Sequence, residues 1–79
     1  MKPLHTDLAV KIIQTAAKTK HNVYLHKGRI TIDAKSILGV LSLCTIEDII
    51  VESRDLKIRD TIKELLRIEE EAWVNYGKA

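Results

Sequence analysis

The stretch NVYLHKGRITID (residues 22–33) alternates apolar and polar side chains, unlike the helical spacing on either side of it. Its aliphatic residues flank a Lys-Gly turn at residues 27–28 and are Val23, Leu25, Ile30 and Ile32. Side chains two positions apart on a strand share one face of a sheet. The stretch therefore predicts a β-hairpin with one apolar face.

An amphipathic helix is predicted before this hairpin. Between Leu8 and Ala17, apolar side chains recur at the three- and four-residue spacing of one helix face. Thr6 or Asp7 can cap the helix, and an acidic residue in the first turn suits the positive end of the helix dipole. We expect the helix to end near residues 20–22.

A short helix and a third strand are predicted after the hairpin. Ser36 is a good N-cap for the densely apolar stretch 37–43, which we interpret as a short buried helix. Ile46 and residues 49–51 lie between acidic neighbours and predict a strand.

The longest helix is predicted at the end of the chain, with Asp55 as its cap. Its apolar stripe consists of Ile58, Ile62, Leu65 and Leu66. Glu69 interrupts this stripe before Ala72, Trp73 and Tyr76 resume it.

This order of elements predicts a single α+β domain over residues 1–79. Three helices should cover one face of a small antiparallel sheet in a two-layer, open-faced sandwich. Because the chain has no Phe and one Trp, its core must be aliphatic.

The composition argues against several classes of function. A net charge of +2 with both signs mixed along the chain does not indicate nucleic-acid binding. No apolar run approaches the roughly 20 residues that span a bilayer, no secretory signal opens the chain, and one cysteine excludes an internal disulfide. We therefore expect a cytoplasmic protein.

No motif for catalysis, metal or cofactor binding is found. The chain has no paired carboxylates, glycine-rich phosphate loop or nucleophile triad, so we expect a binding protein or phosphoacceptor and not an enzyme. His21 and His26 lack further ligands at metal spacing and are interpreted as surface residues. Cys44 is expected to be a small buried hydrophobe near a helix end.

Two stretches resemble the histidine-containing phosphocarrier (HPr) family of the bacterial sugar phosphotransferase system. His5-Thr6-Asp7-Leu8-Ala9 is similar to that family's His-x-Arg-Pro-Ala motif, with Asp7 in place of the arginine and Leu8 in place of the proline. The stretch AKSILGVLSL (residues 34–43) closely resembles the segment that holds the family's regulatory serine. The resemblance implies an HPr-like fold and protein partners in the phosphotransferase system.

The resemblance makes His5 the candidate phosphohistidine. A helix N-terminus favours an anion, but a neighbouring cation is also needed, and Asp7 stands where the family has one. A carboxylate about 4 Å from a phosphate costs roughly 1 to 4 kcal/mol per unit charge. Lys2 or Lys11 could replace the cation. His5 is thus either an exposed residue before a helix or an altered phosphoacceptor.

Ser36 is the candidate for regulatory phosphorylation, because the matching serine of the family is phosphorylated by a dedicated kinase. A phosphate is tolerated at the start of a helix. Partner contacts are expected nearby and at the aromatic pair near the end of the chain, at Lys35, Ile37, Leu38, Val40, Trp73 and Tyr76.

These observations favour an accessory or regulatory protein of the phosphotransferase system, controlled at Ser36. A working phosphocarrier using His5 and an oligomerising adaptor without phosphate chemistry are the alternatives. Family members begin with a strand that only residues 1–4 could supply here, so the edge at residues 47–53 should be uncovered. We therefore expect a homodimer, joined across this edge or through the C-terminal helix.

Overall fold

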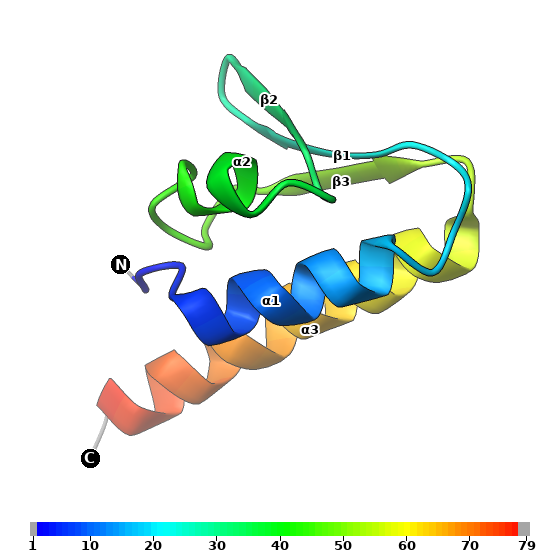
Figure 1. Ribbon diagram of the computed structural model, residues 1–79. Helices are drawn as coiled ribbons and strands as arrows, with labels where there is room; N and C mark the ends of the chain where they lie inside the picture. The colour runs from blue at the N-terminus through cyan, green and yellow to red at the C-terminus, as the bar shows by residue number, and fades with distance from the viewer. Residues whose placement is uncertain (1, 78–79) are drawn as a thin grey trace.

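The computed structural model describes the backbone of residues 2–77 and the side chains of residues 2–72. Three helices and a three-stranded antiparallel sheet form a two-layer sandwich, which confirms the predicted fold class. Figure 1 shows α1 and α3 side by side below the sheet. In chain order the elements are α1 (Thr6–Ala16), β1 (Val23–Lys27), β2 (Ile30–Asp33), α2 (Ile37–Leu41), β3 (Ile50–Ser53) and α3 (Leu56–Gly77).

The sheet is built around the predicted hairpin, with strand order β2-β1-β3. Leu25 in the central strand pairs with Ile32 on one side and with Val51 on the other. This apolar row faces the helices, and Leu25 and Val51 are buried. Gly28 takes the left-handed backbone conformation (φ 58°) that the tight turn between β1 and β2 needs.

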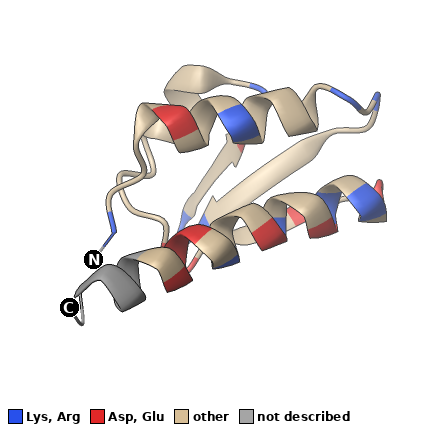
Figure 2. Ribbon diagram, turned by 90° about the horizontal axis from the view of Figure 1, so that it is seen from below, with Lys and Arg blue, Asp and Glu red and all other residues tan. Residues whose placement is uncertain are grey.

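The core is aliphatic, as predicted. Long apolar side chains of α1 and α3 meet those of the sheet, and the largest that are fully buried are Leu8, Ile12, Leu25, Ile62, Val23 and Val40. Outside the core, Figure 2 shows acidic and basic residues mixed along α3. Arg67, for example, donates to Glu64 and to Glu71, the latter at 2.6 Å. Among the described residues, no helix is both long and apolar enough to cross a membrane.

The cap of α1 differs from the prediction. Thr6 already has helical geometry, and the capping residue is His5, whose Nδ1 accepts the Leu8 N–H at 3.3 Å. An imidazole nitrogen here takes the place of the oxygen that usually satisfies a first-turn N–H. The choice of Thr6 or Asp7 as the cap was wrong by one or two positions.

The predicted caps of the other helices are confirmed. Ser36 Oγ accepts the Gly39 N–H at 3.2 Å, and Asp55 Oδ1 accepts the Ile58 N–H at 3.1 Å. The third strand begins at Ile50, later than predicted.

Two predictions of burial were wrong. Helix α2 is only five residues long and packs on the body mainly through Val40, so it is not a buried helix. Cys44 is exposed. Its left-handed backbone (φ 67°), where the chain turns after α2, leaves its side chain outside the core.

The segment before α1 pairs with the loop that precedes β3, through an isolated antiparallel bridge between Pro3 and Thr45. The Leu4 N–H donates to the Cys44 carbonyl at 2.8 Å, and the Ile46 N–H donates to the Lys2 carbonyl at 3.1 Å. Within residues 2–77, however, β3 pairs with no strand except β1. The other edge of Ile50–Ser53 therefore has no strand partner in the described part of the chain.

The cap of α3 makes the stability of the protein depend on pH. The N–H of Ile58 and the hydroxyl of Thr19 hold the pKa of the Asp55 carboxyl below its ordinary value of 3.8. Because the folded-state pKa is depressed, the stabilisation is complete above pH 3.8 and is lost as the pH falls through the folded-state value. Asparagine caps a helix about as well as aspartate but carries no charge.

We therefore predict that Asp55→Asn lowers the urea midpoint of unfolding at neutral pH and that the difference from the parent protein disappears in strong acid. Asp60→Asn, which neutralises an exposed carboxylate of the same helix, is the control for net charge. A difference for Asp55→Asn that stays constant down to strongly acidic pH would contradict the role of the ionised cap.

Candidate functional site

His5 lies at the N-terminus of α1 with its side chain 42% exposed. Its backbone is extended, and its Nδ1 is directed at the first turn of the helix, where it accepts the Leu8 N–H. The free N–H groups and the dipole of a helix N-terminus favour an anion. Of the two ring nitrogens, Nδ1 is the one that lies in this field.

The other ring nitrogen of His5 faces a carboxylate from the far end of the chain. Nε2 lies 3.7 Å from Glu69 Oε2, and the same oxygen lies 3.6 Å from Lys2 Nζ. Figure 1 shows the cause: α3 runs antiparallel to α1, so its second half passes beside the start of α1. We call Lys2, His5 and Glu69 the His5 cluster.

Glu69 was not among the site residues predicted from the sequence. The interruption of the apolar stripe of α3 at this position was the available indication. Leu66 is the last buried residue of that stripe in the described side chains, and Glu69 lies where α3 leaves the core. A polar residue is therefore accommodated there because it meets Lys2 and His5 instead of apolar side chains.

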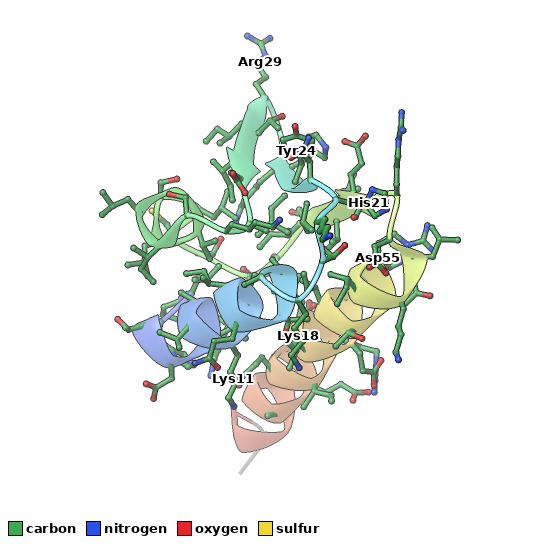
Figure 3. The ribbon with its side chains drawn as sticks, turned by 45° about the vertical axis from the view of Figure 1, so that its right-hand side comes forward. Lys11, Lys18, His21, Tyr24, Arg29 and Asp55 are labelled. Atoms are coloured by element: carbon green, nitrogen blue, oxygen red, sulfur yellow. The ribbon has the colours of Figure 1, made fainter. Side chains whose placement is uncertain are left out.

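Lys2 is the lysine that the structure places in this cluster. Its backbone is held on both sides: its N–H donates to Glu47 Oε1 at 2.6 Å, and its carbonyl accepts the Ile46 N–H. The first of these bonds is the main cause that lowers the pKa of the Glu47 carboxyl. Lys11 lies further along α1 (Figure 3) and is absent from the ion pairs of the cluster. Asp7 is exposed in the first turn of α1.

Ser36 is exposed at the start of α2, where the chain is fixed by two bonds that precede the helix. The Lys35 N–H donates to Asp33 Oδ1 at 2.8 Å, and Lys35 Nζ donates to the Thr19 carbonyl at 2.8 Å. The Lys35 ammonium therefore ties α2 to the loop after α1. The Ser36 hydroxyl, by contrast, faces solvent next to its capping bond.

Two apolar side chains beside Ser36 are on the surface. Leu38 is 78% exposed and Ile37 is 39% exposed. We call Ser36, Ile37 and Leu38 the α2 surface. Val40 is fully buried, so it supports this surface from beneath and is not available for direct contact with a partner.

The remaining predicted residues lie apart from these two sites. The side chains of Trp73 and Tyr76 lie outside the described residues. His21 is exposed in the loop at the other end of α1 from His5 (Figure 3). His26 is half-buried and bridges the strands through Thr31 Oγ1 at 2.8 Å and Glu52 Oε1 at 2.5 Å. In the described part of the chain, no group of three or more His, Cys, Asp or Glu could hold a metal ion.

A histidine caps the first helix and a serine caps the second on this open-faced sandwich. The family model for the HPr component phosphorylation site of the phosphotransferase system matches residues 2–66. The chain belongs to the HPr family.

Several solved structures share the fold. Crh, a catabolite repression protein of Bacillus subtilis, is 20% identical over 84% of this chain and 82% of that one, with a TM-score of 0.74. Its crystal structure is described as a dimer with a swapped domain. HPr of Thermoanaerobacter tengcongensis is 25% identical over 86% of this chain and 82% of that one, with a TM-score of 0.70. No curated protein sequence matches the chain.

Proposed function

We propose that this HPr-family chain is a regulatory protein that binds protein partners of the phosphotransferase system and is controlled by phosphorylation at Ser36. The observation that carries the proposal is the position of Ser36, an exposed helix cap directly followed by exposed Ile37 and Leu38. Neither site has the donor set of a catalyst, so the protein acts as a phosphoacceptor and a binding surface.

A phosphate on Ser36 would change the α2 surface without dismantling the helix. The Ser36 Oγ already accepts the Gly39 N–H, and phosphate oxygens accept such a bond more strongly than a hydroxyl does. The modification adds about −1.5 to −2 charges at neutral pH. Because this charge would lie beside Leu38, it would weaken the binding of a partner that covers the apolar side chain. It would strengthen the binding of a partner that presents arginine to the phosphate.

A working phosphocarrier that uses His5 is the second candidate. The direction of Nδ1 toward the N–H groups of α1 and the presence of Lys2 in the cluster favour it. Glu69 at 3.7 Å and Asp7 in the first turn place two carboxylates around the site, and these oppose an added phosphate. Because of these negative charges, we rank His5 below Ser36 as a candidate site of phosphorylation.

The two candidate functions can be distinguished by the acid stability of the phosphoryl group, which is stable on serine and labile on histidine. The protein is incubated with ATP and the family's serine kinase, and separately with phosphoenolpyruvate and the family's phosphoryl-donor enzyme, and is then weighed intact before and after acid treatment. We expect an acid-stable gain of one phosphoryl group with the kinase, absent from Ser36→Ala. Ser42→Ala is the matched control, because Ser42 is an exposed serine at the other end of α2.

Absence of an acid-stable gain would overturn the proposal for Ser36. An acid-labile gain from the donor enzyme that is lost in His5→Ala would establish the phosphocarrier instead. If no label forms under either condition, the protein acts as an adaptor without phosphate chemistry.

We further propose that two copies of the chain associate as a homodimer. Ile50 is 67% exposed on β3, whose outer edge has no strand partner within residues 2–77, and Ile68 is 50% exposed on α3. An unpaired strand edge invites association with another chain. Crh, which shares this fold, is described as a dimer, and this supports the association of two copies here.

Sedimentation equilibrium over micromolar concentrations tests the dimer. We expect a mass approaching twice the 9.0 kDa of one chain. The matched variants Ile50→Lys and Ile68→Lys each place a charge on an exposed isoleucine, so the variant that restores the monomer identifies β3 or α3 as the interface. A mass of 9.0 kDa for the parent protein at every concentration would contradict the dimer.

A further inference from the structure

We propose that Lys2 is the phosphate-binding cation of the His5 cluster and that Glu69 holds it beside His5 while the histidine is unphosphorylated. The proposal rests on the second candidate function, in which His5 accepts a phosphoryl group. Lys2 Nζ and His5 Nε2 approach the same Glu69 oxygen, at 3.6 and 3.7 Å. A single carboxylate therefore brings the ammonium to the ring that would be modified.

The contacts of His5 select one form of its ring. Nδ1 accepts the Leu8 N–H and so carries no proton in the neutral ring. Nε2 faces the carboxylate of Glu69 and is the nitrogen that carries the proton. The lone pair for attack is therefore the one on Nδ1, which becomes available when the Leu8 N–H bond opens.

Phosphoryl transfer to this ring changes the partner of Lys2. The Leu8 N–H releases Nδ1, whose lone pair forms the new N–P bond, while the bond between phosphorus and the donor breaks and its electron pair leaves with the donor; the freed Leu8 N–H can then donate to a phosphoryl oxygen. Nε2 keeps its proton, so the modified ring is cationic and remains a partner for Glu69. The phosphoryl group is a dianion and attracts the Lys2 ammonium, which shifts from Glu69 toward it.

Lys2 is suited to this role because its anchoring does not depend on its ammonium. The bonds to Glu47 and Ile46 are made by the N–H and carbonyl of Lys2. They fix the start of the side chain next to α1, and the side chain is 18% exposed. A change of the side chain should therefore alter the charge at His5 while leaving the segment in place.

The test uses potassium phosphoramidate, which phosphorylates histidine directly and releases ammonia, so no donor enzyme is required. The initial rate of acid-labile labelling is measured separately at each histidine by NMR. We expect Lys2→Gln to slow the labelling of His5 about tenfold, the effect of roughly one unit charge near contact distance. Lys2→Arg should restore it, and Lys11→Gln is the matched control.

His21 and His26 serve as internal references, because neither belongs to the cluster. Their labelling should be unchanged in Lys2→Gln, as should the urea midpoint. Glu69→Gln, which keeps an oxygen for Nε2–H and releases Lys2, should speed the labelling of His5, whereas Glu70→Gln should not. Equal His5 rates in the parent protein and in Lys2→Gln would overturn the proposal while leaving His5 an acceptor. Failure to label His5 where His21 and His26 are labelled would overturn both.

Discussion

The antiparallel packing of α1 against α3 is the constraint on which the rest of this structure depends. Buried Leu8 and Ile12 of α1 meet the core that Ile58 and Ile62 of α3 complete over the sheet. This packing fixes how each helix is rotated about its own axis and where it lies along the axis of the other. It therefore places the end of one apolar stripe, at Glu69, beside the first residue before the other helix, at His5. A contact between residues 64 positions apart follows from a purely aliphatic interface.

The same core explains why the two candidate phosphorylation sites differ. Helix α2 is short and buries mainly Val40, so Ser36 and Leu38 remain open to solvent and to partners. His5 instead stands where α3 passes, and its surroundings are already occupied by opposite charges. Phosphate at Ser36 meets a capping N–H, whereas phosphate at His5 must rearrange an existing ion pair. This difference supports a protein used mainly for regulated binding.

Much of the fold could be predicted from local pattern. The alternation in residues 22–33 predicted the hairpin. The caps at Ser36 and Asp55 were predicted because a short polar side chain directly before an apolar helical stretch commonly caps the helix N-terminus. The cap of α1 was missed because Thr6 and Asp7 are the usual choices, and nothing local indicates that an imidazole will take that role. Helix α2 was wrongly predicted to be buried because periodicity cannot define burial over five residues. The exposure of Cys44 was missed because no local pattern indicated its left-handed backbone.

The candidate site could be predicted only where it is local. His5 and Ser36 lie in contiguous motifs, whereas the roles of Lys2 and Glu69 depend on how the N-terminal segment and α3 meet in three dimensions. Lys2 and Lys11 were equivalent in sequence, and the bonds from Lys2 to Glu47 and Ile46 distinguish them. The ion pairs between residues far apart in the sequence could be identified only from the three-dimensional structure.

The most direct test of the central claim, that Ser36 is a regulatory site on an otherwise unchanged fold, is a comparison of backbone amide NMR spectra before and after phosphorylation of Ser36. We predict shift changes confined to residues 34–42 and to the parts of α1 and β2 that contact α2, with β1, β3 and α3 unaffected. Changes throughout the core, or loss of the α2 resonances, would show that the phosphate disrupts the helix and would contradict the account.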